Sequence, residues 1–394
     1  MTEIQRPDIY FSAIDPNYRV KGSRDPLGFQ VLWANAGHKA VAYLSTVSVN
    51  LQDFMILSYG HYFYEMFDFQ EKLPFLAFFL KFEQACAYTR YYVNGVHSFN
   101  GTTHVATKQN DTTFSISLKN SDALMSNQRA YGIMGKYIRP FTDMKIKKRE
   151  EFNSVMENAM RKTDLSVLAT IIKKLQQEQV NLTKNDLKPL GRLLKKITPD
   201  EKEFYRKYIL QVPDSDHPQN NLYKLLLRNK QLVKSYEFKL HSAIDHLVKD
   251  SMITDELRNA LINIQNTDRV LYPVNSWLTR LLNNSHWTFD EIREDKLLNM
   301  HFEPLAHIFE EEDLQEMNQW LSLPAEEKVE KIVERNKMIQ ENRGNRAWII
   351  PENGYRVVYG ESEYRIENID PQNDFAFPYF LDAYFSLFKQ IELV

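Results

Sequence analysis

Apolar residues recur every three or four positions along most of this chain, and the repeat predicts helices with one buried face. In the first third, we expect one helix over about residues 44–57 and a second over 72–92. Residues 150–343 read as nearly continuous helix with short polar breaks. The apolar positions that carry these predictions are Leu44, Val47, Leu51, Phe54, Leu57, Leu168, Ile171, Ile172, Leu175, Val329, Ile332, Val333 and Ile339.

Three segments depart from the helical pattern. Up to Trp33, aromatic and β-branched residues alternate with proline and glycine, which predicts loop and short strands. Residues 94–117 are rich in Asn, Gly and Thr, and Asn100-Gly101 is a turn signal, so we expect a small hairpin or an exposed loop. The run SNQRAYGIMGKYIRP predicts a glycine-containing helix that ends before Pro140.

The end of the chain changes period again. Asn353-Gly354 lies between two β-rich runs and predicts a hairpin, with a third strand at residues 364–366. An aromatic helix over 375–393 follows. The fold class is therefore mainly α: multi-helical, with short N-terminal strands and a small C-terminal β-hairpin element.

Charge divides the chain more sharply than its total of -3 suggests. Residues 136–250 carry 24 Lys and Arg against 15 Asp and Glu, whereas residues 251–394 carry 14 against 26. We expect three domains: a mixed one over 1–145, a basic helical one over 146–250, and an acidic helical one over 251–394. The basic segment favours an anionic partner and the acidic one a basic protein partner, although solvated helix faces also fluctuate in sign.

The composition and the N-terminal sequence indicate which cross-links and which cellular location to expect. Cys86 is the only cysteine, so intrachain disulfides and a cysteine-based zinc cluster are excluded. The chain begins without a basic and apolar leader, and its most apolar window, 73–80, is broken by Lys81 and Glu83. We expect a cytoplasmic protein with no membrane span.

Two helical runs match at an offset of 22 residues: DLSVLATIIKKL from Asp164 and DLKPLGRLLKKI from Asp186. A duplicated helix would display its lysine pairs in equivalent places, as candidate nucleic-acid contacts. Independent helices also converge on this pattern, because Asp near the start and Lys near the end both complement the helix dipole. The four lysines are Lys173, Lys174, Lys195 and Lys196.

Familiar catalytic motifs are weak in this sequence. Neither a phosphate-binding glycine loop ending in Lys-Ser or Lys-Thr nor an HExxH zinc pattern occurs. One metal-dependent nuclease pattern is present, in which Asp200 and Glu237 would hold magnesium and Lys239 would polarise water or phosphate. Such carboxylates need adjoining strands, whereas Asp200 lies in the helix-capping sequence Thr198-Pro199-Asp200-Glu201.

Two other pairs, Arg280 with His286 and Arg90 with His97, resemble the Arg-x4-6-His pattern of helical ribonucleases of the HEPN type. That resemblance implies that Arg and His act on the phosphate and the 2'-hydroxyl. Chance supplies about one or two such spacings in a chain of this composition. Of the two, Arg280 and His286 have the better helical setting.

Histidines and acids also cluster in two places, at residues 301–310 and 241–246. Only some of these residues are spaced so that they share one helix face, as metal ligands on a helix would be. Histidines exposed among acidic residues are the commoner interpretation. We therefore predict neither a metal nor a cofactor. The residues concerned are His301, Glu303, His307, Glu310, His241, Asp245 and His246.

The run NYRVKGSRDPLGFQVLW, residues 17–33, is the strongest single candidate for a ligand-binding loop. Its Arg19, Lys21 and Arg24 lie near glycines, a chemistry suited to phosphate or carboxylate groups. The alternative is structural, because Asp25-Pro26-Leu27-Gly28 is also a plausible turn with Asp accepting local N–H bonds.

The stretches VKGSRDPLGFQVLW and LMSNQRAYGIMGKYIRPF resemble a poorly characterised bacterial family encoded among anti-phage defence genes. The resemblance covers about the first 140 residues and implies a bacterial protein acting with partners on foreign nucleic acid. We expect a non-catalytic subunit of an antiviral defence complex that binds nucleic acid through the basic middle region and a protein through the acidic end. The alternatives are a nuclease and a purely structural assembly protein.

Overall fold

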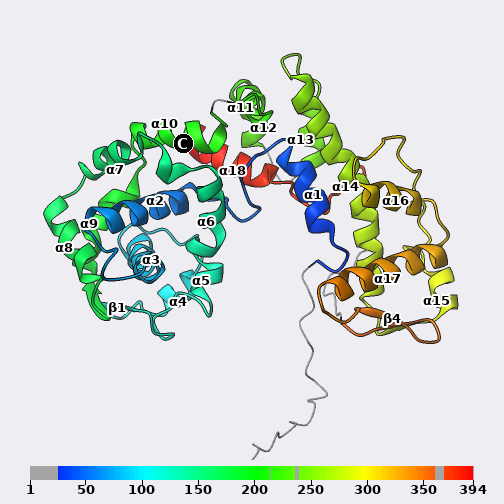
Figure 1. The fold of residues 1–394 in the computed structure, drawn as a ribbon, viewed down its shortest axis with the longest axis horizontal. Helices are drawn as coiled ribbons and strands as arrows, with labels where there is room; N and C mark the ends of the chain where they lie inside the picture. The colour runs from blue at the N-terminus through cyan, green and yellow to red at the C-terminus, as the bar shows by residue number, and fades with distance from the viewer. Residues whose placement is uncertain (1–24, 214, 236–238, 360–367, 394) are drawn as a thin grey trace, which may run out of the picture. The chain divides into compact units, whose positions relative to one another are not determined.

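The computed structural model describes residues 25–213, 215–235, 239–359 and 368–393. They form two compact units, and the chain passes between them within helices α1 (Phe29–His38) and α14 (Asp255–Leu281) and again after Ala376. The larger unit comprises residues 33–265 and 377–394, and the smaller one residues 1–32 and 266–376. The prediction of a mainly helical fold is confirmed (Figure 1). No helix among the described residues is long and apolar enough to cross a membrane.

In the larger unit, α2 and α3 form the centre, with α6, α7 and α9 packed around them (Figure 1). Phe54, Phe63, Phe78 and Phe82 are fully buried there. The elements of this unit are α2 (Leu51–Met66), α3 (Phe75–Tyr92), α4 (Thr102–Ala106), β1 (Thr113–Ser117), α5 (Gln128–Tyr131), α6 (Ile133–Asp143), η1 (Ile146–Lys148), α7 (Phe152–Met160), α8 (Leu165–Lys174), β2 (Gln179–Thr183), α9 (Lys184–Lys195), α10 (Pro199–Tyr205), the π-helix η2 (Arg206–Leu210), α11 (Gln219–Arg228), α12 (Lys230–Lys234), α13 (Leu240–Leu247) and α18 (Leu381–Glu392).

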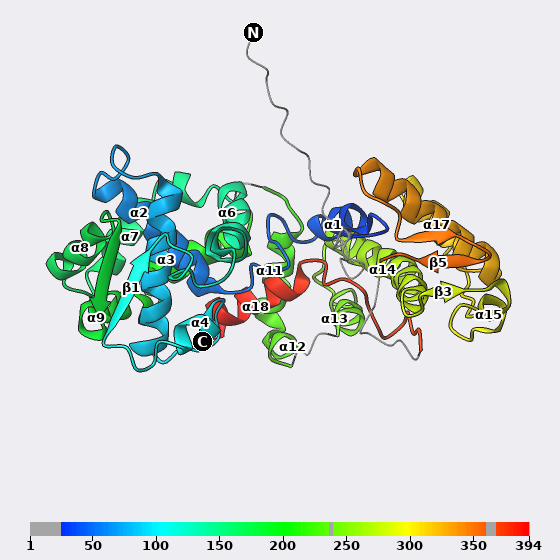
Figure 2. The same cartoon turned by 90° about the horizontal axis from the view of Figure 1, so that it is seen from below.

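The smaller unit packs helices beside a three-stranded antiparallel sheet of order β3-β5-β4. Figure 2 shows β3 and β5 beside α17, and Trp277 and Trp287 are fully buried in this unit. Its elements are β3 (His286–Trp287), α15 (Phe289–Glu294), α16 (Glu312–Trp320), α17 (Ala325–Asn342), β4 (Ile349–Pro351) and β5 (Tyr355–Val357). Helices α1 and α14 each contribute residues to both units.

Several sequence-based expectations are confirmed at the level of single elements. The helix expected over 72–92 is α3, and the aromatic helix expected over 375–393 is the shorter α18. The helix expected over 44–57 is only partly confirmed, since α2 begins at Leu51 after the capping residue Asn50 and leaves Leu44 and Val47 outside it. The hairpin at Asn353-Gly354 is β4 paired with β5. Its expected third strand at 364–366 lies outside the described residues, and the third strand of this sheet is β3.

Three local expectations were wrong. Phe29, Val31 and Trp33 lie on helix α1 and not on strands, because the carboxylate of Asp25 accepts hydrogen bonds from the first N–H groups of that helix. Of the two alternatives for residues 94–117, the local hairpin is wrong, since β1 pairs with the distant β2, whereas Gly95, His97 and Ser98 do lie in an exposed loop. Helix α6 does not stop before Pro140 but continues to Asp143.

The Asn353-Gly354 turn gives the first testable prediction. Both residues have positive φ, 46° and 112°, and a Cβ on Gly354 would stand 2.1 Å from the backbone oxygen of Trp287. Gly354→Ala should therefore lower the free energy of unfolding by about 2–3 kcal/mol. Urea unfolding followed by tryptophan fluorescence measures this, since four of the five tryptophans belong to the smaller unit.

Gly344→Ala is the matched control, because Gly344 has a similar positive φ of 70° but nothing within 4 Å of its Cβ position. It should cost only about 1 kcal/mol. Equal decreases in the two variants would contradict a role for close packing against β3.

Candidate functional site

Helix α9 follows directly from strand β2, and its start is fixed by a capping box. The Thr183 hydroxyl accepts the N–H of Asp186, and the Asp186 carboxylate accepts the N–H of Thr183. This reciprocal pair satisfies two N–H groups that the helix itself cannot. The helix then buries Leu187, Leu190 and Leu194 against the unit.

The opposite face of α9 carries four exposed cations, which we call the α9 cationic stripe: Lys184, Lys188, Arg192 and Lys195. They are three or four residues apart, so successive side chains lie on one face of the helix. With a rise of 1.5 Å per residue, the stripe is about 16 Å long.

None of the four stripe cations forms an ion pair with another described residue. Other exposed cations of the same unit do, for example Lys147 with Glu65 and Lys207 with Glu151. Like charges three or four residues apart destabilise a helix by about 0.2–0.5 kcal/mol per pair. The stripe is thus a concentrated positive charge that the described part of this unit does not neutralise by contact.

The structure separates the four lysines predicted as nucleic-acid contacts. Lys195 belongs to the stripe, whereas Lys173 on α8 lies over the ring of Phe67, with Nζ 5.5 Å from its centroid. The charge of Lys174 helps to lower the pKa of Asp186, after the hydrogen bonds from Thr183. Lys196 follows α9, and its carbonyl accepts a hydrogen bond from another lysine, Lys162 (2.6 Å).

The two matching helices begin differently. Asp164 is the N-cap residue of α8, whereas Asp186 is the third residue of α9 and Thr183 is its N-cap. Helices that share a pattern for dipole reasons alone need not share capping positions, and this difference favours convergence. The other three stripe residues were missed, although their spacing of three or four is visible in the sequence.

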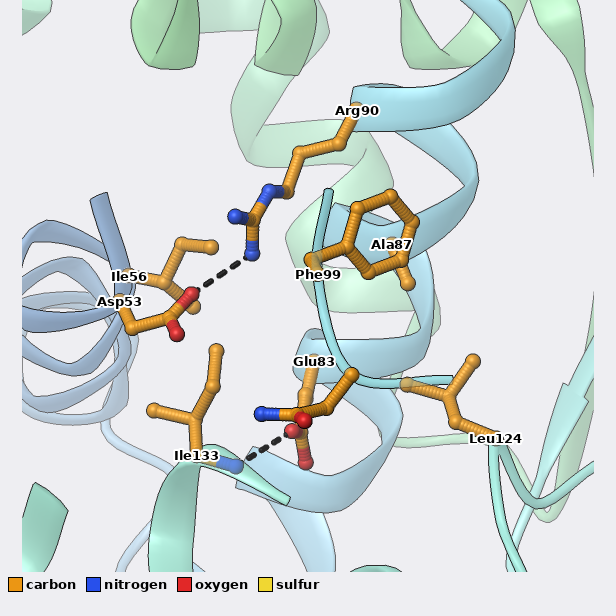
Figure 3. Close-up of a pocket in the computed structure, with 9 residues that line it drawn as sticks. Asp53, Ile56, Glu83, Ala87, Arg90, Phe99, Leu124 and Ile133 are labelled. Atoms are coloured by element: carbon orange, nitrogen blue, oxygen red, sulfur yellow. Dashed lines mark hydrogen bonds and ion pairs between the residues drawn. The ribbon is translucent and has the colours of Figure 1, made fainter. Parts of the chain in front are cut away.

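A second polar feature of the larger unit lies between α2 and α3 (Figure 3). The Arg90 guanidinium donates from Nη1 to the Asp53 carboxylate at 2.7 Å, and both side chains are at most 5% exposed. The guanidinium also stacks over Phe99, 4.6 Å from the ring centroid. Its Nε and Nη2 atoms have no hydrogen-bond partner among the described residues.

The neighbouring Glu83 connects α3 to the start of α6. Its carboxylate accepts the backbone N–H of Ile133 at 2.6 Å (Figure 3), and it also accepts the side-chain amide of Gln128 at 2.9 Å. Burial raises the pKa of Glu83 to about 7, against the effect of these two hydrogen bonds. The cavity that Glu83, Arg90 and Asp53 line has a volume of about 10 Å³, space for about one water molecule. This cluster therefore serves the packing of three helices and has no room for a substrate.

The candidate ribonuclease pairs have structural partners. Arg90 is buried as described, whereas His97 lies in the loop after α3 and packs against the ring of Tyr91. Arg280 donates from Nε and Nη2 to the Asp295 carboxylate at 2.8 and 2.7 Å. A ring nitrogen of His286, on β3, lies 3.0 Å from the Glu352 carbonyl.

The other candidate chemistry is not assembled in the described parts of the chain. Asp200 lies in the first turn of α10 and accepts from Asn158, Lys239 precedes α13, and Glu237 is outside the described residues. Among those residues no group of three or more His, Cys, Asp or Glu is placed to hold a metal. The histidine clusters at 241–246 and 301–310 thus have no metal-binding geometry.

In the smaller unit, residues 25–28 form a turn that α17 holds from several sides. Arg335 Nε donates to the Leu27 carbonyl at 2.7 Å, and Asn336 Nδ2 donates to the Pro26 carbonyl at 3.0 Å. Arg343 pairs with the Asp25 carboxylate at 3.0 Å. The structural interpretation of this turn is confirmed, while the neighbouring Arg19, Lys21 and Arg24 lie outside the described residues.

Comparisons with protein-family models, with curated proteins and with solved structures find no match to this chain. The resemblance to a family of anti-phage defence proteins therefore stays a prediction.

The turn at Asp25 generates the second prediction. Its carboxylate accepts the N–H groups of Phe29 at 2.7 Å and Gln30 at 3.2 Å besides pairing with Arg343. Asp25→Ala should lower the free energy of unfolding by about 1–2 kcal/mol, because the start of α1 loses its cap. Asp25→Asn keeps an acceptor and should be less destabilising. Equal stability of the wild type and Asp25→Ala in tryptophan-detected urea unfolding would refute this role.

The third prediction concerns the pH dependence of Glu83. Its pKa in the folded chain, about 7, exceeds the ordinary value of 4.5, so the folded state binds more protons between these values. The contribution of Glu83 to stability is thus full below pH 4.5 and is lost as pH rises through 7, by roughly 3 kcal/mol.

Unfolding followed by circular dichroism from pH 4.5 to 8 tests this when Glu83→Gln is compared with the wild type. The difference in unfolding free energy should change across that window in favour of the variant, whatever constant offset the new amide introduces. The exposed Glu178→Gln is the control, and its difference from the wild type should stay flat. A flat difference for Glu83→Gln as well would show that this carboxyl does not titrate there.

Proposed function

We propose that this protein is a non-catalytic, nucleic-acid-binding subunit of a bacterial anti-phage defence complex. The observation that supports nucleic-acid binding is the α9 cationic stripe, with four exposed cations and no ion pair among the described residues. The assignment to defence is an inference from the sequence resemblance alone. Binding of a protein partner by the acidic segment 251–394 is inferred from charge, since a basic surface would complement it.

The energetics of the stripe favour an anionic partner. Neighbouring cations on one helix face repel each other, and no ion pair among the described residues offsets that repulsion by contact. A nucleic-acid backbone would replace that repulsion with charge-assisted hydrogen bonds and release its own condensed counterions. The length of about 16 Å corresponds to roughly five phosphates of one strand, at about 3.4 Å of axial rise per nucleotide.

The proposal of a non-catalytic role follows from what the candidate residues do in the fold. Arg280 is held by Asp295, and Arg90 is closed off between two helices. Both arginines thus have structural tasks that do not require a substrate. The stripe, by contrast, consists of Lys and Arg side chains, whose N–H groups are donors without an acceptor lone pair, which suits them to hold an anion by charge-assisted hydrogen bonds.

The fourth prediction tests the stripe. Lys188→Glu with Arg192→Glu should lower the affinity for mixed-sequence 20-nucleotide DNA and RNA, measured by fluorescence anisotropy, by at least about tenfold at roughly 100 mM salt. The slope of log K against log salt should become shallower by about one for each phosphate that the variant no longer neutralises.

Lys224→Glu with Arg228→Glu is the matched control, because these exposed cations have the same spacing on α11. Reversal of Lys173 and Lys174 on α8 forms a second comparison and should weaken binding less than the stripe variant. Full affinity in the stripe variant would remove α9 from the binding surface and refute the proposal.

A further inference from the structure

The end of α3 brings a set of aromatic rings to the beginning of the α9 cationic stripe. Lys184, the first stripe residue, has its Nζ 4.9 Å from the centroid of the Tyr92 ring. The segment that follows α3 is tied to α9, because Asn94 Nδ2 donates to the Gly191 carbonyl at 3.1 Å. Figure 2 shows α3, β1 and α9 close together in the same part of the larger unit. The rings and the cations therefore have a fixed mutual placement.

Three rings of this set stack on one another and support the others. Tyr92 and Phe114 are nearly parallel at 4.8 Å, and Tyr88 stacks on the same Phe114 at 4.6 Å. The Tyr92 hydroxyl donates to the Val105 carbonyl at 2.7 Å. These contacts hold Tyr92 in one orientation under Lys184.

The outer rings are accessible to solvent. Tyr91 meets Tyr92 at 4.8 Å and 65°, and His97 meets Tyr91 at 4.4 Å and 71°. Tyr91 is half-buried and His97 is exposed. Gly95 lies between these two residues in the chain and is exposed, with nothing within 4 Å of its Cβ position. The space beside its backbone is therefore open to a ligand.

From this arrangement we infer that the nucleic acid is single-stranded and that one or more of its bases stack on Tyr91 and His97. The inference rests on the proposed function of the stripe. A cationic track beside aromatic rings is the combination that binds unpaired strands, because bases of a single strand expose their faces whereas those of a duplex do not. Phosphates would lie along α9, and the strand would reach the rings at Lys184.

The experiment compares three probes by anisotropy: labelled 20-nucleotide oligo(dT), a 20-base-pair duplex, and inorganic polyphosphate as an unlabelled competitor without bases. The wild type should bind the single strand at least about tenfold more tightly than the duplex. Tyr91→Ala should lower the single-strand affinity on the order of tenfold, as expected when one base no longer stacks. Its affinity for the duplex and for polyphosphate should stay unchanged, and Tyr91→Phe should restore the single-strand affinity.

Tyr131→Ala serves as the control, because Tyr131 is an exposed tyrosine elsewhere in the same unit, at 46% exposure. Equal affinity of the wild type for single strand and duplex, with no effect of Tyr91→Ala, would overturn this inference. An equal decrease for all three probes in Tyr91→Ala would overturn it too, since it would indicate a structural role. In both cases, the separate sensitivity to Lys188→Glu and Arg192→Glu decides whether the proposed function still stands.

Discussion

The packing of the larger unit depends on a buried arginine whose charge requires an acidic partner. Arg90 on α3 is 2% exposed, and the Asp53 carboxylate on α2 is its ion-pair partner. Removing one member of such a buried pair typically costs about 3–5 kcal/mol, because the remaining charge is stranded away from water. The pair therefore ties α2 to α3, and Glu83 extends the same polar cluster to α6. Helix α9 packs against this α2–α3 centre.

The proposed binding surface thus lies on a helix whose opposite face packs into the core. On α9, one face packs leucines into the unit and meets the end of α3, so the other face must point outward with its cations. The same contact, from Asn94 to Gly191, brings Lys184 over Tyr92. A stable core is what gives the proposed strand-binding surface its geometry.

In the smaller unit, polar side chains also fix the packing, here by donating hydrogen bonds to backbone carbonyls. The turn at residues 25–28 is far in sequence from α17, yet Arg335, Asn336 and Arg343 satisfy its carbonyls and its carboxylate. Cations that look available in the sequence are used here as hydrogen-bond donors. Arg280, bound to Asp295, is another example.

Local chemistry in the sequence was enough to determine several elements. The helical repeat predicted α3 and part of α2. The reciprocal capping pairs Thr198 with Glu201 and Thr288 with Glu291 set the starts of α10 and α15, and Asn353-Gly354 set the hairpin, because each signal acts within a few residues. The spacing of the stripe cations is also local, and could have been recognised.

Only the tertiary structure decided which polar residues are buried in pairs and which face solvent. The pairing of β1 with β2 joins segments more than 60 residues apart, and no local signal encodes it. Arg90 and Lys184 are both cations in segments that the sequence predicts as helix. One is buried against Asp53 and the other lies exposed over Tyr92. Their difference comes from which distant side chains the packing of α2, α3 and α9 brings near them.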